Sequence, residues 1–368
     1  MKLNEDFLNS MQEAMTLLRT SGPLEATEAI QRALRGEHAI READVSAFTS
    51  PTLRDFPQPV EPVVHARREQ SANAEDRGHF STRAYSNEAG RRQYKLYVPS
   101  GYHGDPLPLI VALHGCTQDA DDFAAGTQMN ALAERHRCIV AYPVQPQGAN
   151  PSKCWNWFKP TDQQRATGEP SLIAGITREI MADYAVDPSR VYVAGMSAGG
   201  AMAAIMIRAY PELYAAAGVH SGLAHGCAHD LPSALAAMKG GRRARAGRGA
   251  DRHHAGHAGE APRRPLIVFH GDADATVHVS NALHVLQGFD AHATIDTNAQ
   301  VRRRKPDERA HTVERRISAD GVEAELWIIH GAPHAWSGGS GRGTYTDASG
   351  PDASAEMMRF FLSHPMLK

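Results

Sequence analysis

The sequence has little net charge, few cysteines and no long apolar run. Among its 368 residues, 39 are Lys or Arg and 41 are Asp or Glu, so the formal net charge is -2. Such a balance supplies no overall field that would recruit nucleic acid or an anionic membrane. No stretch approaches the roughly 20 apolar residues that a membrane-spanning helix needs. We therefore expect neither nucleic acid nor a membrane span.

The first 20 residues also lack the apolar core of a secretory signal, because acidic and polar residues interrupt them. With no visible signal peptide, a cytoplasmic location is favoured. The four cysteines, Cys116, Cys138, Cys154 and Cys227, match no zinc-binding spacing, and we expect no metal site. Several disulfide pairings are open to four cysteines, and buried free thiols are the general expectation in a cytoplasmic enzyme.

Apolar periodicity divides the chain into parts. Two stretches within residues 1–36 carry apolar residues at helical spacing and are separated by "SGP", which predicts a helical hairpin. Residues 37–88 lose this periodicity and contain many prolines and charges, which predicts a flexible linker. The remainder, residues 89–368, is expected to form one large domain.

Within this domain short apolar runs alternate with helix-like stretches. The runs are "PLPLIVALHG", "CIVAYP", "VYVAGMS", "AAAGVHSG", "PLIVFHGDAD" and "AELWIIHGAPH". Buried strands that alternate with helices predict an α/β fold with a mostly parallel central sheet and helices on both faces. Two interruptions, residues 239–264 and 298–318, are rich in Arg and other charged residues, and we expect both to be surface insertions.

The stretch "VYVAGMSAGGAMAA" places Ser197 between a strand-like run and a helix-like run. Its G-x-S-x-G pattern is typical of a nucleophile elbow, a strained turn that lifts the serine hydroxyl above the sheet. Gly195 and Gly199 are needed there because a side chain at either position would collide with a neighbouring element. A small residue in a tight corner would explain the pentapeptide alone, but the flanking runs favour a nucleophile.

A serine nucleophile needs a base and a third group that orients the base. Asp272 and Asp274 follow one predicted strand, and His330 and His334 follow the last one. We prefer Asp274 as the acid and expect Asp272 to be a loop or capping residue. We prefer His334 as the base, because its Gly-Pro loop lets it reach the serine, and expect His330 to be a core histidine. The order Ser, Asp, His is that of an α/β-hydrolase.

The tetrahedral intermediate of such a reaction needs two backbone donors for its oxyanion. One is expected to be the amide of Ala198, which follows the nucleophile. The other is expected in the loop "LHGCTQ" after an early strand. Cys116 is the preferred donor there, and its neighbour Thr117 is the alternative.

Several motifs in combination resemble the esterase and poly(3-hydroxybutyrate) depolymerase family of α/β-hydrolases. They are "LHGCTQDADDFAAGTQMN", "CWNWF", "DPSRVYVAGMSAGGAMAA", "HGDADATVHVSN", "GAPHAWSGG" and "GTYTDASGPDASAEMMRFFLSHP". The resemblance covers roughly residues 90 to 366. It implies that residues 89–368 are the catalytic domain of a serine esterase that needs no cofactor and uses Ser197, Asp274 and His334.

The resemblance also implies a substrate class. Its first implication is hydrolysis of poly(3-hydroxybutyrate) or short hydroxyalkanoate oligomers through an acyl-enzyme, so the partner is a polyester or a small ester. Relatives with the same core cleave feruloyl or acetyl groups from plant polysaccharides, which is the alternative. A catalytically inactive binding protein of the same fold is a further alternative.

Other features are interpreted through the same resemblance. It implies a disulfide bond between Cys116 and Cys154 and leaves an extracellular location open. The N-terminal hairpin either docks to a partner or polymer-granule surface or packs against the domain. Aromatic faces suit an apolar acyl chain or ring, whereas core packing is the alternative for each ring. On that basis we expect a substrate groove lined by Trp155, Asn156, Trp157 and Trp336.

Overall fold

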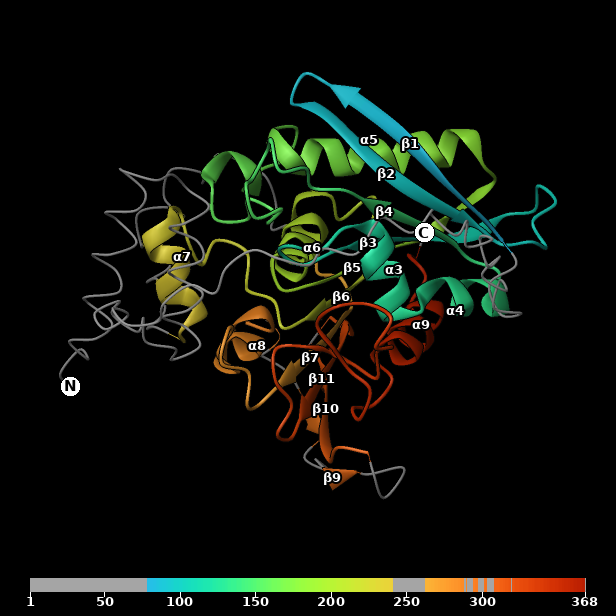
Figure 1. Cartoon of the computed structure of the whole chain (residues 1–368). Coiled ribbons are helices and arrows are strands. Elements are labelled where there is room, and N and C mark those ends of the chain that lie inside the picture. The colour runs from blue at the N-terminus through green and yellow to red at the C-terminus, as the bar shows by residue number, and fades with distance from the viewer. Residues whose placement is uncertain are drawn as a thin grey trace, which may run out of the picture. The chain divides into compact units, whose positions relative to one another are not determined.

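The computed structural model describes residues 78–240 and 262–367, apart from residues 288, 290–293, 297–300, 303–307 and 319 (Figure 1). The expected hairpin at residues 1–36, most of the expected linker and most of the insertion at 239–264 lie outside the described residues. Among the described helices, none is both long and apolar enough to cross a membrane.

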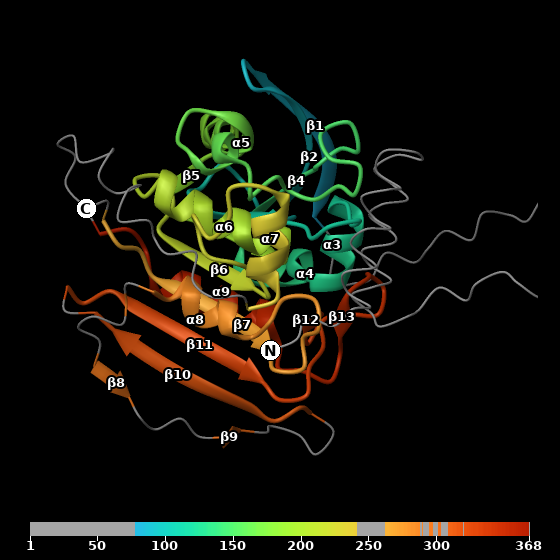
Figure 2. The ribbon, with the colours of Figure 1, turned by 90° about the vertical axis from the view of Figure 1, so that its left-hand side faces the viewer.

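Most described strands belong to one sheet, ordered β1-β2-β4-β3-β5-β6-β7-β11-β10-β8, with β9 paired to β10. The strands of this sheet are β1 (His79–Asn87), β2 (Gly90–Val98), β3 (Leu107–Leu113), β4 (Ile139–Pro143), β5 (Val186–Met196), β6 (Ala216–His220), β7 (Leu266–Gly271), β8 (Thr294–Asp296), β9 (Val301–Arg302), β10 (His311–Ile317) and β11 (Glu323–Ile329). From β4 to β11 in this order, neighbouring strands are parallel. Figure 2 shows β1 and β2 at one edge and β8 to β10 at the other. A separate pair joins β12 (Trp336–Ser337) to β13 (Thr346–Asp347).

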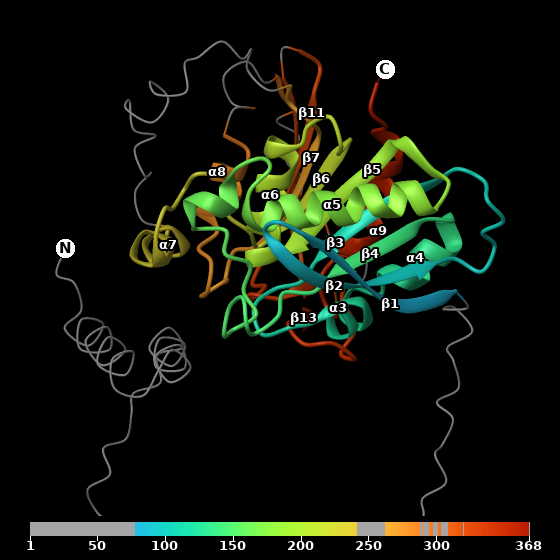
Figure 3. The same cartoon turned by 90° about the horizontal axis from the view of Figure 1, so that it is seen from above.

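Helices cover both faces of the sheet (Figure 3). On one face lie α5 (Gly168–Asp183), α6 (Ala198–Ala209), α7 (Leu231–Met238) and α8 (Ser280–Val285). On the other lie α3 (Ala120–Thr127), α4 (Met129–His136) and α9 (Ala353–Ser363), and a short 3-10 helix, η1 (Pro160–Gln163), precedes α5. This arrangement confirms the predicted α/β-hydrolase fold.

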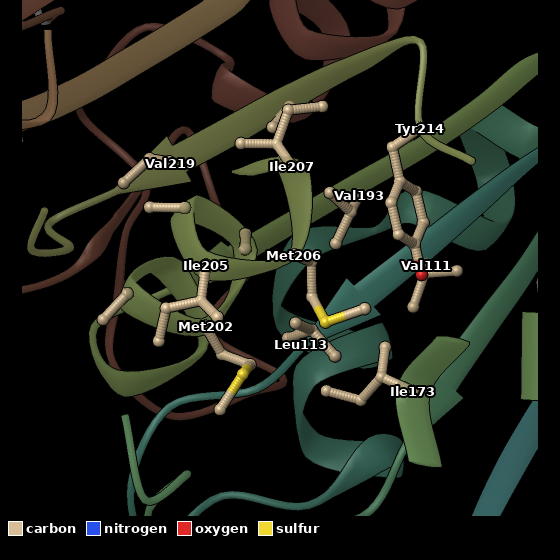
Figure 4. Close-up of a cluster of buried hydrophobic side chains, with 14 of the residues drawn as sticks. Val111, Leu113, Ile173, Val193, Met202, Ile205, Met206, Ile207, Tyr214 and Val219 are labelled. Atoms are coloured by element: carbon tan, nitrogen blue, oxygen red, sulfur yellow. The ribbon is translucent and has the colours of Figure 1, made fainter. Parts of the chain in front are cut away.

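The core explains why the central strands read as continuous apolar runs. All seven residues of β3 are buried, because helices cover the sheet on both sides. Figure 4 shows part of the cluster, in which Met202 and Met206 of α6 pack with Leu113 of β3 and Val193 of β5. Each fully buried side chain of this size stabilises the fold by about 1.5–3 kcal/mol. The small residues at the start of α6 let its backbone approach the sheet closely.

Two boundaries differ from the sequence expectation. Residues 79–87, expected at the end of the linker, form β1, which pairs with β2 along its whole length. This edge strand has no fully buried residue, so its apolar signal is weak. Residues 311–317, expected within a charged surface insertion, form β10, antiparallel to β11. His311 and Val313 of β10 are buried, and the intervening charged residues concealed that alternation.

Candidate active site

The turn from β5 into α6 holds Ser197 in a strained backbone conformation. Its φ is 56° and its ψ is -120°, and non-glycine residues seldom adopt a positive φ. A Cβ on Gly195 would lie 2.3 Å from the carbonyl oxygen of Gly199, and a Cβ on Gly199 would lie 2.1 Å from that of Leu113. Both glycines are therefore required because the backbones of strand and helix touch. The predicted elbow geometry is present.

His334 and Asp274 form a hydrogen-bonded pair beneath the surface. Asp274 follows β7 and His334 follows β11, and these strands are parallel neighbours. Nδ1 of His334 donates to Oδ2 of Asp274 at 2.7 Å, and the two side chains are 11% and 0% exposed. Oδ1 of Asp274 accepts the amides of Thr276 at 2.9 Å and Val277 at 2.8 Å. The carboxylate is thus fixed on one side by its own loop and on the other by the imidazole.

The electrostatics of this pair suit an ionised acid. Burial alone would raise the pKa of Asp274, but the hydrogen bond and charge of His334 and the amide of Val277 lower it below its ordinary value. His270 lies beside the same carboxylate, with Nε2 3.5 Å from Oδ2. Burial lowers the pKa of His270, whose Nε2 donates to the carbonyl of Val277 at 2.7 Å. His270 therefore stays neutral near pH 7, and the negative charge of Asp274 is available to His334.

His220, at the end of β6, connects the serine turn to the histidine loop. Its carbonyl oxygen accepts the amide of Ser197 at 2.9 Å, and its Nε2 accepts the amide of Ser337 at 3.0 Å. Its ring stacks on Trp336, with 5.0 Å between centroids. Burial lowers the pKa of His220 to about 3, so the ring is neutral at pH 7. The elements that carry Ser197, Asp274 and His334 therefore meet at the carboxyl ends of neighbouring inner strands.

The loop after β3 is fastened at its first residue, His114. Nδ1 of His114 donates to the carbonyl of Gly115 at 2.7 Å, and Nε2 accepts the amide of Gln145 at 3.1 Å. The carbonyl of His114 accepts the indole N–H of Trp155 at 3.1 Å. Burial lowers the pKa of His114 to about 4, which keeps this ring neutral. The loop lies beside the serine, since a Cβ on Gly115 would be 3.6 Å from Cβ of Ser197.

The backbone of this loop distinguishes the two candidate oxyanion donors. The amide of Thr117 already donates to the carbonyl of Ser152 at 2.7 Å. The amide of Cys116 makes no hydrogen bond to another described residue. Ala198 is the first residue of α6, where amides have no partner within the helix. The contacts therefore favour Cys116 and Ala198 over Thr117.

The disulfide bond implied by the family resemblance is formed between Cys116 and Cys154. Cys138 and Cys227 are free thiols. The bond joins the loop after β3 to the segment that contains "CWNWF". It therefore adds a covalent restraint beside the amide of Cys116.

The residues predicted to line a substrate groove are buried instead. The exposed fractions are 0% for Trp155, 4% for Asn156, 6% for Trp157 and 2% for Trp336. Trp155 donates to the His114 carbonyl, and Nε1 of Trp336 donates to Oγ of Ser354 at 3.0 Å. This burial argues against direct substrate contact by Trp155, Asn156 and Trp336, and Trp157 offers little surface. The motifs predicted that aromatic residues lie near the site, but the sequence does not show which way their rings face.

Sequence reasoning missed Glu169, a buried acid in the first turn of α5. It accepts the backbone amide and the Nδ2 of Asn156, each at 2.7 Å, and a hydrogen bond from Gln145. Gln145 in turn donates to the carbonyl of Cys154 at 3.0 Å. Burial raises the pKa of Glu169. The only available signal was an acid at a helix start, which usually has no role beyond stabilising the helix.

The competing acid and histidine form a second pair. Nδ1 of His330 lies 2.8 Å from Oδ2 of Asp272, and each side chain is 37% exposed. Asp272 also accepts the amide of Gly331 at 2.6 Å. It lies in the turn after β7, so of the two predicted roles, loop or capping residue, it has the first. The prediction that His330 is a core histidine is wrong, because it follows β11 at the surface, where Nε2 meets Oγ1 of Thr312 at 2.8 Å. Among the described residues, no group of His, Cys, Asp or Glu could hold a metal ion.

The chain is similar to a known protein family and to several known proteins. Residues 92–312 match the family model described as Esterase PHB depolymerase. Over 218 residues, 59% of this chain and 52% of the relative, the chain is 35% identical to poly(3-hydroxyalkanoate) depolymerase C of Paucimonas lemoignei. Over 211 residues, 55% of this chain and 70% of the relative, it is 34% identical to feruloyl esterase B of Neurospora crassa.

A solved structure shows the same fold. The acetyl xylan esterase from Aspergillus awamori superposes with a TM-score of 0.56 at 21% identity, over 76% of this chain and 98% of that one. In sequence, the chain spans about half the length of the depolymerase that it matches.

Proposed function

Because the chain belongs to the esterase and PHB depolymerase family, we propose that it hydrolyses carboxylic esters through an acyl-enzyme on Ser197. The observation that carries this proposal is the strained turn at Ser197 beside strand ends that hold the buried pair of His334 and Asp274. A serine on such a turn and an imidazole oriented by a carboxylate are the parts that nucleophilic acyl transfer requires.

In the proposed reaction, Oγ of Ser197 attacks the ester carbonyl and Nε2 of His334 takes its proton. The oxyanion accepts the amides of Cys116 and Ala198, and loss of one such donor typically lowers turnover about 100- to 1000-fold. The C–O bond then breaks, and the alcohol leaves with the proton from His334. Water repeats the sequence on the acyl-enzyme and releases the acid. Asp274 holds the imidazole in the required tautomer and stabilises its cation.

We propose poly(3-hydroxybutyrate) or short hydroxyalkanoate oligomers as the substrates. The support is the 35% identity to a protein named poly(3-hydroxyalkanoate) depolymerase C. Feruloyl or acetyl esters are the second candidate, favoured by the 34% identity to feruloyl esterase B, of which the match covers 70%. The catalytic unit would lie in residues 89–368, extended by β1 to His79. Docking of residues 1–36 to a polymer granule stays a prediction.

The substrate is tested by incubating the protein with amorphous polyester granules, hydroxybutyrate oligomers, methyl ferulate and acetylated xylan. Chromatography then identifies the acids released, with the Ser197→Ala variant as the control. Release of 3-hydroxybutyrate from granules or oligomers supports the first candidate. Release of ferulate or acetate alone replaces it with the second, and no release from any ester contradicts the proposed activity.

The disulfide bond is relevant to the cellular compartment in which the protein works. Disulfide bonds persist in oxidising compartments and are rare where thiol reductants are maintained. Since Cys116 and Cys154 are joined beside the proposed oxyanion site, we propose that the protein works outside the cytoplasm. Thiol labelling of the protein isolated from its source without reductant tests this: Cys116 and Cys154 should resist alkylation, and their free alkylation would contradict the proposal.

A further inference from the structure

Three non-glycine residues at the candidate site have a positive φ. Ser197 has φ 56°, Thr117 has φ 65° and Tyr345 has φ 52°. For a β-branched residue such as Thr this conformation is an outlier. Strained backbone of this kind persists only where the surroundings fix it, and it gathers at functional sites. The serine is explained by the elbow, whereas Thr117 and Tyr345 need a separate explanation.

Thr117 and Tyr345 contact each other through their hydroxyl groups, which are 3.2 Å apart. The hydroxyl of Thr117 donates to the carbonyl of Cys116 at 2.6 Å, so it accepts the proton of the Tyr345 phenol. The backbone amide of Thr117 is held by Ser152. A chain of hydroxyl groups therefore runs from Tyr345 to the residue proposed as an oxyanion donor.

Tyr345 is itself anchored to the loop that carries the proposed base. Its carbonyl accepts the amide of Trp336 at 2.7 Å, and the next residue, Thr346, pairs with Trp336 between β12 and β13. Trp336 is buried and follows His334 by two positions. Tyr345 thus joins the histidine loop, through its backbone, to the oxyanion loop, through its phenol.

The ring of Tyr345 also offers the surface that the tryptophans lack. Tyr345 is 45% exposed, and Thr117 beside it is exposed as well. A Cβ on Gly115 would lie 3.6 Å from Cβ of Ser197, and two residues of chain from Gly115 to Thr117 span at most about 7 Å. A group next to an ester carbonyl held at Ser197 and Cys116 is therefore within reach of this ring. Aromatic rings favour contact with alkyl chains and other rings.

We propose that Tyr345 is a positioning and specificity residue of this site. Its hydroxyl holds the oxyanion loop through Thr117, and its ring contacts the apolar alkyl or aromatic group next to the scissile ester. This inference rests on the proposed esterase function. It assigns to Tyr345 the substrate contact that the sequence had suggested for the buried tryptophans.

The test compares Tyr345→Phe and Tyr345→Ala with the control Tyr184→Phe. The Tyr184 hydroxyl also makes a hydrogen bond, to Arg83, but at the far end of α5. We would measure kcat and KM for p-nitrophenyl acetate and p-nitrophenyl butyrate, and the Tm of each variant. Loss of one hydrogen bond in Tyr345→Phe should lower kcat about 2- to 12-fold. Its KM should change less than about twofold, and Tyr184→Phe should match the wild type.

Removal of the ring should act differently. In Tyr345→Ala, KM for the butyrate should rise about 2- to 12-fold more than KM for the acetate, because only the longer acyl chain reaches the ring. Thr117→Val removes the hydroxyl that accepts the phenol, so Tyr345→Phe should have almost no further effect on kcat in that background. This coupling separates positioning through Thr117 from a general loss of stability.

The outcomes separate this inference from the proposed function. If the wild type hydrolyses both esters and the two Tyr345 variants match Tyr184→Phe, the inference is wrong and the proposed function stands. A loss of activity that only follows a lower Tm, with no change in the ratio of the two KM values and no coupling to Thr117, also overturns it. If the wild type hydrolyses neither ester and Ser197 takes no fluorophosphonate, the proposed function fails and the inference fails with it.

Discussion

The imidazole of His334 and the carboxylate of Asp274, 60 residues apart in the chain, meet at 2.7 Å. The carboxylate is fully buried and accepts two amides of its own loop in addition to the imidazole. Because burial disfavours a charge unless hydrogen bonds compensate it, a carboxylate held in this way is suited to orienting a base. An exposed ion pair would be screened by water and would orient the imidazole poorly.

The first prediction concerns the acid. Asp274→Asn should lower kcat about 10,000-fold, because an amide in place of the carboxylate favours the wrong tautomer of His334. Asp272→Asn is the matched control. Asp272 lies two residues before Asp274, and this change weakens only its partly exposed pair with His330. Its kcat should stay within about tenfold of the wild type. Equal losses in the two variants, measured with p-nitrophenyl butyrate, would contradict the assignment of Asp274.

Stability should decline in mild acid because His114, His220 and His270 are buried in neutral form. Burial lowers the pKa of His114 to about 4 and that of His220 to about 3, from 6.5. Between these values and 6.5 the unfolded chain binds more protons than the folded one, so stability falls as the pH falls through this window. Each unit of pKa difference corresponds to about 1.4 kcal/mol.

Thermal unfolding from pH 7.5 to 4.5 measures this effect. The Tm should be nearly constant above pH 7 and should fall steadily below about pH 6.5. His136→Gln removes an exposed histidine and should leave this slope unchanged. A Tm that stays constant down to pH 4.5 would show that His114 and His220 are not held neutral by burial.

The disulfide bond should support both stability and turnover. Replacing Cys154 with Ala should lower the free energy of unfolding by about 2–4 kcal/mol, because the bond closes a long loop of the unfolded chain. It should also lower kcat more than it raises KM, since Cys116 loses its covalent restraint. Cys227→Ala, which removes a free thiol, is the control. Urea denaturation and ester kinetics on both variants check this. An unchanged kcat in the Cys154 variant would show that the bond does not support turnover.

Much of the fold could be predicted from the sequence because the central strands are buried on both faces. For this reason all of β3 and the first four residues of β7 read as unbroken apolar runs. β1 and β10 could not be predicted in this way, because each lies near an edge of the sheet and alternates exposed with covered residues. The helix α3, "ADDFAAGT", has no clear helical periodicity in the sequence, because Phe123 is its only large apolar residue.

Some residues of the site could also be predicted from the sequence, and others could not. Ser197, Asp274 and His334 could be proposed because their types and order carry the chemistry. The burial of Trp155 and the surface position of His330 depend on how loops turn, which residue type does not reveal. Tyr345 lies in one of the motifs that carry the family resemblance, but its residue type did not mark it as a site residue, because its distinguishing features are a backbone angle and a contact with Thr117.

The most direct test of the account is covalent labelling of Ser197. The protein is treated with a fluorophosphonate, and intact-mass and peptide-mass spectrometry locate the adduct. If Ser197 is the nucleophile, we expect one adduct on the wild type, at Ser197, and none on Ser197→Ala. In this variant kcat for p-nitrophenyl butyrate should fall on the order of a millionfold. A wild type that takes no label, or a Ser197→Ala variant that retains turnover, would contradict this assignment.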